Sequence, residues 1–140
     1  MARINPEFIT ELKKYGAGDY TACFNCGTCT ATCSLSTEEN SFPREMIRYS
    51  TLGLEGEIAS SLKPWLCYYC GECSSQCPRT AEPGELMMSL RRWLTAKYDW
   101  TGLSGLLYKS LMLTWTAMIL VFVGVLAFAW YKDFNIEQIM

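Results

Sequence analysis

Eight cysteines, arranged in two matched runs, are the residues whose type and spacing point most directly to chemistry. One run begins at Cys23 and the other at Cys67, and both follow the spacing C-x2-C-x2-C-x3-C. A cubane iron–sulfur cluster needs one soft thiolate at each iron corner, and two-residue gaps let a tight loop supply three of them. The fourth cysteine, three residues further on, then points toward a different cluster. The sequence therefore predicts two [4Fe–4S] clusters with ligands crossed between the runs.

This crossed arrangement assigns every cysteine to a metal-binding site and no residue to catalysis. Cluster 1 is expected to bind Cys23, Cys26, Cys29 and Cys77. Cluster 2 is expected to bind Cys67, Cys70, Cys73 and Cys33. Gly27 and Gly71 occupy the same place in each run, where the backbone must pass close to a bulky cofactor.

Two other uses of these cysteines fit the pattern less well. A structural zinc site usually takes two well-separated C-x2-C pairs, whereas here four cysteines fall within eleven residues, twice over. A disulfide framework needs an oxidising compartment, and the first sixteen residues lack the apolar core that an export signal would have. Iron–sulfur ligation is the preferred interpretation.

Composition argues against several other classes of protein. The chain has 140 residues, a formal net charge of −2 and no histidine. This charge gives no reason to expect nucleic acid as a partner. Without histidine, the chain itself offers no Rieske ligand, no haem-ligating imidazole and no histidine general base. Because metal binding contributes folding free energy, two clusters would also compensate for the small core of a short domain.

The residues around the two runs favour helices. Asn5 is expected to cap a helix that begins at Pro6, and further helices are expected from Pro43, over about 55–62, and from Pro83. No alternating apolar and polar pattern indicates a strand. Every cysteine of the second run lies 44 residues after its counterpart, which predicts a pseudo-two-fold arrangement. The expected fold class is therefore all-α.

The helix expected after the second run has an apolar stripe that is typical of a core-facing helix. Its members are Leu86, Met87, Leu90, Trp93 and Leu94. Arg91, Arg92 and Lys97 lie largely off the stripe. Packing within the domain is the preferred role for this helix, and contact of its basic residues with anionic lipid headgroups is the alternative.

A segment of 22 uncharged residues lies between Lys109 and Lys132. As a helix it would extend about 33 Å, enough for the roughly 30 Å hydrocarbon core of a bilayer. Trp115 and the pair Trp130-Tyr131 suit the two interfaces. Basic residues are more numerous before the segment than after it, so the cluster domain is expected on the cytoplasmic side of the inner membrane, in contact with lipid.

The expected organisation of the chain has four parts. They are a dicluster domain over 1–100, a juxtamembrane segment over 101–109, a transmembrane helix over 110–131 and a tail over 132–140.

One-electron relay is the expected use of two neighbouring clusters. The sequence has no phosphate loop, dinucleotide fingerprint or nucleophile motif that would indicate substrate chemistry. Phe24, Tyr68 and Tyr69 flank predicted ligands and are expected to keep water from the clusters, as well as to pack. Donor and acceptor would then lie on other subunits.

The paired runs, the tract Trp-Leu-Cys67-Tyr-Tyr-Cys70-Gly-Glu-Cys73 and the segment Cys77-Pro-Arg-Thr-Ala-Glu-Pro-Gly-Glu resemble the family of heterodisulfide reductase C subunits. Within the family, the resemblance is greatest to its quinone-interacting, membrane-bound branch. It covers residues 1 to about 110, including all eight cysteines. It implies an α-helical ferredoxin domain, and flavin and iron–sulfur partners that resemble the A subunit of heterodisulfide reductase.

Membrane-bound members of this family continue into several helices that bind haem b and exchange electrons with quinone. This sequence has one apolar segment and no histidine, so haem ligation does not carry over and another membrane subunit would complete a quinone site. The resemblance implies an iron–sulfur electron-transfer subunit between a cytoplasmic flavin/iron–sulfur module and the quinone pool. The alternatives are the equivalent subunit of a heterodisulfide reductase-type complex, with catalysis in a partner, and a membrane-anchored iron–sulfur sensor.

Overall fold

The computed structural model describes residues 4–131 and is helical wherever that range has regular structure. Within it no β-strand forms, and an isolated bridge between Thr37 and Asn40 is the β-type pairing present. The predicted all-α class is confirmed. The chain divides into two compact units, Met1–Gly105 and Leu106–Met140, which are described separately. The expected tail at 132–140 lies outside the described residues.

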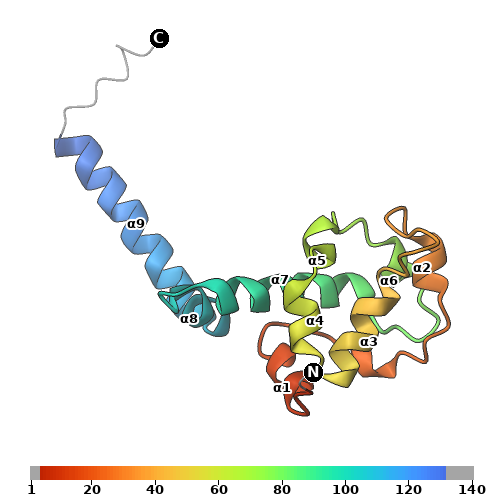
Figure 1. Ribbon diagram of the computed structural model, residues 1–140. Helices are drawn as coiled ribbons and strands as arrows, with labels where there is room; N and C mark the ends of the chain where they lie inside the picture. The colour runs from red at the N-terminus through yellow and green to blue at the C-terminus, as the bar shows by residue number, and fades with distance from the viewer. Residues whose placement is uncertain (1–3, 132–140) are drawn as a thin grey trace, which may run out of the picture. The chain divides into compact units, whose positions relative to one another are not determined.

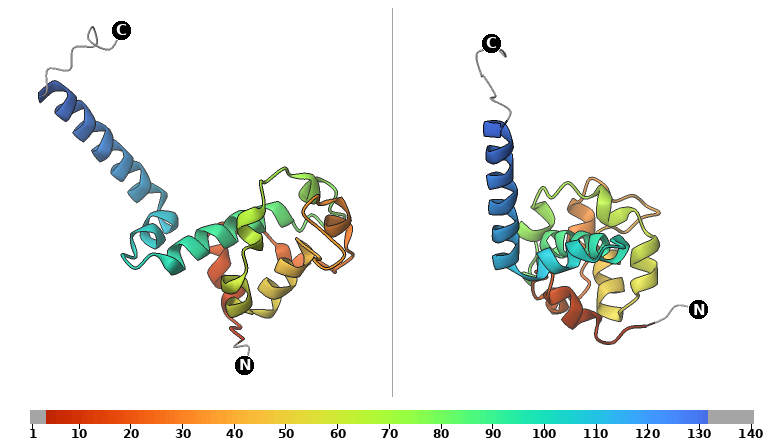
Figure 2. Two further views of the ribbon diagram at one scale, coloured as in Figure 1. Left: turned by 45° about the horizontal axis from the view of Figure 1, so that its top comes forward. Right: turned by 90° about the vertical axis from the view of Figure 1, so that its left-hand side faces the viewer.

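Helix α7 (Pro83–Tyr98) is the longest helix of the first unit (Figure 1). It packs against α1 (Phe8–Lys13), α3 (Arg44–Leu52), α5 (Lys63–Leu66) and α6 (Glu72–Ser75). Figure 2 shows the short helices gathered around it. The domain is therefore organised on one central helix rather than on a layered pair.

The predicted apolar stripe of α7 is buried, as expected. Its five members are Leu86, Met87, Leu90, Trp93 and Leu94, none more than 3% exposed. The ring of Phe8 meets that of Trp93 edge-on, with centroids 5.0 Å apart. Burying side chains of this size stabilises the fold by about 1.5–3 kcal/mol each relative to exposure.

The basic residues of α7 also have partners within the domain. Arg92 Nη1 donates to the carbonyl oxygen of Tyr15 at 2.9 Å. Lys97 Nζ lies 4.4 Å above the Trp93 ring centroid and 3.5 Å from a Glu55 carboxylate oxygen. These contacts favour the packing role of the helix over the lipid-contact alternative.

Helix α1 begins two residues later than predicted, at Phe8 instead of Pro6. Asn5 does cap the chain, since its Oδ1 accepts the N–H of Glu7 at 3.0 Å. However, the N–H of Asn5 is bonded to the carbonyl oxygen of Gly53 at 2.9 Å. This long-range contact holds the Asn5–Glu7 segment in a turn before the helix.

Helix α4 (Glu55–Ser60) is shorter than the expected helix over about 55–62. Ser61 is extended, and its hydroxyl oxygen accepts the N–H of Lys63 at 3.2 Å. Serine often competes with the helix backbone in this way, so it ends one helix and begins another. The chain therefore has a break at Ser61, followed by α5.

The two cysteine runs enclose short helices that pack on each other. The first run follows a 3-10 turn (Tyr20–Ala22) and contains α2 (Thr28–Thr32), and the second contains α6. Contact between α2 and α6 brings segments 44 residues apart in the chain side by side. This is the pairing that the internal repeat predicts.

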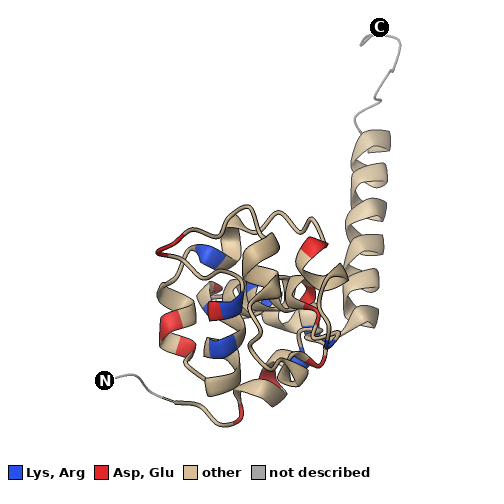
Figure 3. Cartoon of the chain, turned by 90° about the vertical axis from the view of Figure 1, so that its right-hand side faces the viewer, with Lys and Arg blue, Asp and Glu red and all other residues tan. Residues whose placement is uncertain are grey.

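Helix α8 (Leu103–Lys109) leads to α9 (Leu111–Tyr131), which has 21 residues and a mean hydropathy of 2.4 over its most apolar window. Helix α9 carries no charged residue, whereas acidic and basic residues are mixed over the short helices (Figure 3). By length and composition it is able to cross a membrane.

Candidate iron–sulfur site

The two cysteine runs have the same local backbone. Gly27 and Gly71 cap α2 and α6 in the left-handed region, with φ of 91° and 84°. The N–H groups three and four residues beyond each glycine donate to its carbonyl oxygen, at 3.0 Å in all four cases. Glycine adopts this conformation without steric cost, so the spacing of each run produces the same sharp turn.

A second pair of equivalent residues is also left-handed. Asn25 has φ of 67° and Tyr69 has φ of 58°. Asparagine visits this region easily, whereas a tyrosine there is uncommon. The hydroxyl of Tyr69 donates to the carboxylate of Glu85 on α7, and this bond raises the pKa of the tyrosine. The turn of the second run is thus anchored to the central helix.

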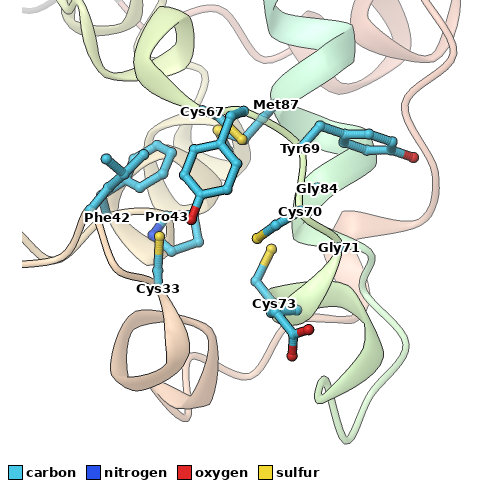
Figure 4. Close-up of a pocket in the computed structure, with 13 residues that line it drawn as sticks. Cys33, Phe42, Pro43, Cys67, Tyr69, Cys70, Gly71, Cys73, Gly84 and Met87 are labelled. Atoms are coloured by element: carbon cyan, nitrogen blue, oxygen red, sulfur yellow. The ribbon is translucent and has the colours of Figure 1, made fainter.

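Four of the cysteine thiols line one pocket (Figure 4). Cys67, Cys70 and Cys73 come from the second run, and Cys33 reaches the pocket from the end of the first. In Figure 4, Cys33 lies on the opposite side of the pocket from Cys70 and Cys73. Phe42, Pro43, Met87 and other mainly apolar groups complete the lining. This set is the one predicted for cluster 2.

Two side-chain contacts connect each run to the end of the other. The hydroxyl groups of Ser34, which follows Cys33, and Tyr68, which follows Cys67, are 2.8 Å apart. Arg79, two residues after Cys77, directs Nε to the carbonyl oxygen of Ala22 at 3.5 Å. Each contact places the fourth cysteine of one run near the first cysteine of the other. The predicted ligand crossing has a structural basis in these contacts, and the ligand sets themselves stay a prediction.

The cysteines predicted for cluster 1 differ in environment. Cys29 is buried and Cys26 is exposed, while Cys23 and Cys77 are partly buried. The sulfur of Cys23 accepts the N–H of Asn25 at 3.4 Å, and that of Cys77 accepts the N–H of Ala81 at 3.4 Å. Hydrogen bonds to the sulfurs help to set the potential of an iron–sulfur cluster.

Burial and hydrogen bonding move the thiol pKa values in opposite directions. The Thr28 hydroxyl, 3.3 Å from the sulfur of Cys26, lowers the pKa of that thiol. Burial raises the pKa of Cys29, and it raises the pKa of Cys73 to about 11. A buried thiolate is costly unless a cation compensates it, and bound iron keeps its ligands deprotonated. Soft donors with this burial fit iron–sulfur binding.

The four thiols of the pocket lie around its walls and do not converge on a single position where one metal ion would bind. Among residues 4–131 no three cysteine or carboxylate side chains converge closely enough to share one metal ion. A single zinc ion would require four sulfurs at about 2.3 Å from one centre. The pocket with four thiols on its walls therefore suits a multi-iron cluster better than zinc.

Arg91 is a supporting residue that the sequence did not identify. From α7 its guanidinium donates to the carbonyl oxygens of Pro64 at 2.7 Å, of Trp65 at 2.9 Å, and of Cys67. It thereby holds the segment that leads into the second run, residues 64–67, against the central helix. Backbone carbonyls leave no mark in a sequence, so no motif indicated these partners.

Comparison with known proteins matches the cysteine-rich part of the chain. Residues 22–82 match the family described as 4Fe-4S dicluster domain. The chain is 37% identical over 76 residues to the C subunit of the H(2):CoB-CoM heterodisulfide,ferredoxin reductase of Methanothermobacter thermautotrophicus and to that of Methanothermobacter marburgensis. Each of these matches covers 54% of this chain and 41% of the relative.

A third relative is the iron-sulfur C subunit of the CoB--CoM heterodisulfide reductase of Methanopyrus kandleri, which is 32% identical over 84 residues. That match covers 54% of this chain and 44% of the relative. The chain thus spans less than half the length of these relatives. Its N-terminal part is helical, matches the 4Fe-4S dicluster domain over residues 22–82, and is similar to the C subunits of heterodisulfide reductases.

Proposed function

We propose that this chain is an iron–sulfur electron-transfer subunit that relays electrons between a soluble flavin/iron–sulfur module and the quinone pool of a membrane. The observation that carries the proposal is the apolar pocket lined by Cys33 together with Cys67, Cys70 and Cys73. Four thiols from two runs around one pocket suit a cluster, and clusters bound this way supply reversible one-electron transfer.

The residues of the chain would hold and shield the two clusters. Cys23, Cys26, Cys29 and Cys77 would bind one, and the thiols of the pocket would bind the other. Phe42, Pro43 and Met87 line the pocket with apolar surface. A shell of this kind limits the access of water, which influences reduction potential. Tyr68 and Tyr69 line the same pocket but are 65% and 47% exposed, so they also form part of the outer surface.

The membrane part of the proposal rests on α9. None of its apolar window is buried by the rest of the described chain. A bilayer would cover this surface, and the basic residues that precede it favour a cytoplasmic cluster domain. Another membrane subunit would complete the quinone site. Flavin and iron–sulfur proteins like the A subunit of heterodisulfide reductase would provide the soluble partner.

The relatives favour a second candidate function. Their names describe subunits of heterodisulfide reductases, so this chain would instead deliver electrons within a disulfide-reducing complex. Both candidates use the same clusters and differ in the reaction partner.

The experiment that separates them is a redox titration of the purified membrane complex, followed by electron paramagnetic resonance. Quinol is added as reductant in one arm and a dithiol in the other. Two interacting [4Fe–4S] signals that respond rapidly to quinol are the expected result. A response to the dithiol alone would favour the disulfide-reducing complex. Stable clusters that respond to neither would favour the sensor, and zinc without iron would overturn both proposals.

A further inference from the structure

Arg44 lies across the turn of the first cysteine run. It is the first residue of α3 and is partly buried. A Cβ atom placed on Gly27 would stand 3.2 Å from Nη1 of Arg44 and 3.9 Å from its Cζ. The missing side chain of Gly27 therefore leaves the space that the guanidinium occupies, beside the backbone that carries Cys26 and Thr28.

This position of Arg44 is unfavourable for the helix itself. A cation in the first turn opposes the macrodipole, whose positive end lies there. Neither ion pair among residues 4–131, Lys63 with Glu45 or Lys97 with Glu55, involves Arg44. A residue that breaks a local rule without a local gain is a candidate for a functional role. The backbone next to the guanidinium is that of Gly27, which directly follows the predicted ligand Cys26.

The second run has no counterpart of this cation. Nothing lies within 4 Å of a Cβ placed on Gly71. Arg44 follows Pro43 at the start of α3, whereas Gly84 follows Pro83 at the start of α7. The residue after the turn glycine is a neutral threonine, Thr28, in the first run, and it is Glu72, which lines the pocket, in the second.

Each run has one guanidinium group near its start. Arg91 approaches the carbonyl oxygen of Cys67, and Arg79 approaches that of Ala22, which precedes Cys23. Among the described residues, the second site also has Glu85, which accepts the Tyr69 hydroxyl beside Cys70. The first site thus has the additional cation Arg44, whereas the second has the carboxylates of Glu72 and Glu85.

We propose that Arg44 raises the reduction potential of cluster 1 above that of cluster 2, so that the site of the first run is the one reduced first. The inference rests on the proposed binding of two clusters. Each reduction adds a negative charge, which a neighbouring cation stabilises and a neighbouring carboxylate destabilises. A unit charge about 10 Å away, at an effective dielectric constant near 20, changes such an equilibrium on the order of tenfold.

The test is a redox titration of the full-length protein with both clusters loaded, followed by electron paramagnetic resonance. Arg44→Gln removes the charge and keeps a shorter polar side chain. Arg48→Gln is the matched control, because Arg48 is exposed one turn further along α3. Iron and sulfide content confirm that all variants hold the same clusters.

Arg44→Gln is expected to make one cluster about tenfold harder to reduce, which is about 59 mV for a one-electron couple. Arg48→Gln should shift neither cluster. Glu72→Gln should make the other cluster easier to reduce. Unchanged potentials in Arg44→Gln, or shifts of the same cluster by Arg44→Gln and Glu72→Gln, would overturn the proposal.

The same titration keeps this inference separate from the proposed function. Clusters that are not reduced by quinol, but whose reduction potential still shifts in Arg44→Gln, would contradict the quinone-linked relay and support the role of Arg44. Clusters that are reduced by quinol, but whose potentials are unchanged in Arg44→Gln, would support the relay and contradict the role of Arg44.

Discussion

At the scale of single residues, the two cysteine runs fold alike because the same few positions demand the same backbone. The glycines at 27 and 71 are left-handed, and so are Asn25 and Tyr69, two residues earlier. A left-handed tyrosine costs on the order of 1–2 kcal/mol. The bond from the Tyr69 hydroxyl to Glu85 helps to offset that cost. Both thiol loops are thus preorganised by backbone geometry, and the loop of the second run is also held by α7.

The crossed ligand sets predict which cysteine variants should resemble each other. Cys33→Ser should alter the same resonance signal as Cys70→Ser, because both residues line the pocket of cluster 2. Cys77→Ser should alter the same signal as Cys26→Ser, from cluster 1. Electron paramagnetic resonance of the four reduced variants, with iron content, checks this. Grouping of Cys33→Ser with Cys26→Ser would mean that each run binds its own cluster.

The cysteines were predictable from the sequence because thiolate ligation imposes a spacing on neighbouring residues. The turn glycines were predictable because they occupy the same position in both runs, and the stripe on α7 was predictable because its apolar residues recur at helical spacing. Arg91 and Arg44 were not, because their surroundings are carbonyl oxygens and backbone brought near by folding. One sequence feature did mark Arg44, namely a cation in the first helical turn, directly after the proline that precedes the helix.

At the scale of elements, helix ends depart from prediction where a distant segment takes up a backbone group. The N–H of Asn5 pairs with Gly53, which lies 48 residues later, and so delays the start of α1. The helices themselves were predicted from apolar spacing and proline positions. Their ends depend on contacts that sequence spacing does not contain.

The same contact makes Gly53 sensitive to substitution. Its φ is 68°, and a Cβ there would stand 2.0 Å from the carbonyl oxygen of Asn5. Gly53→Ala should therefore destabilise the domain by about 2 kcal/mol or more, and lower the midpoint of anaerobic thermal unfolding by roughly 10 °C. Gly56→Ala is the control, since nothing lies within 4 Å of its Cβ position. It should leave stability unchanged or raise it by about 0.5 kcal/mol.

A midpoint for Gly53→Ala equal to that of Gly56→Ala would show that the α1 segment is free to move away from α3. Circular dichroism at a helical wavelength, recorded during anaerobic heating, measures the unfolding midpoint of both variants.

Asp99 holds the turn between α7 and α8. Its carboxylate accepts the N–H groups of Thr101 at 2.9 Å and Ser104 at 2.7 Å, together with both hydroxyls. The hydroxyl of Ser104, followed by that of Thr101, holds the pKa of Asp99 far below its ordinary value of 3.8. Asp99→Ala should loosen this turn and speed tryptic cleavage after Lys97. Asp19→Ala, which removes an exposed acceptor of the Thr21 hydroxyl, is the control and should not.

The sign of the pKa shift sets the pH dependence of this effect. A carboxylate whose pKa is lowered by folding contributes its stabilisation fully above the unfolded pKa, and loses it as pH falls through the folded pKa. The ratio of the cleavage rates of Asp99→Ala and the wild type, measured at each pH with the same trypsin, should therefore stay constant from about pH 8 to about pH 5. A ratio that falls steadily toward one over this range would place the folded pKa higher than the hydrogen bonds imply.

At the scale of the whole molecule, the chain combines two units whose surfaces suit different surroundings, water for the first and lipid for the second. The first unit buries its apolar residues around α7, whereas α9 leaves its apolar surface uncovered by the described chain. The matched relatives extend well beyond the region of similarity. The similarity therefore supports the assignment of the first unit, whereas the assignment of α9 as a membrane helix depends on its length and composition alone. Membrane insertion of α9 is therefore the property of the whole chain that most needs a direct test.

A charge at the middle of α9 provides that test. Val121 lies at the centre of Leu111–Tyr131, and an arginine at the centre of a membrane helix costs about 2.5–3.5 kcal/mol. Tyr131→Arg is the matched control, because an arginine at the helix end reaches the interface. Val121→Arg should be lost from membranes on washing with alkaline carbonate, while the wild type and Tyr131→Arg are retained. Release of the wild type by the same wash would show instead that α9 is covered by a partner protein outside the bilayer.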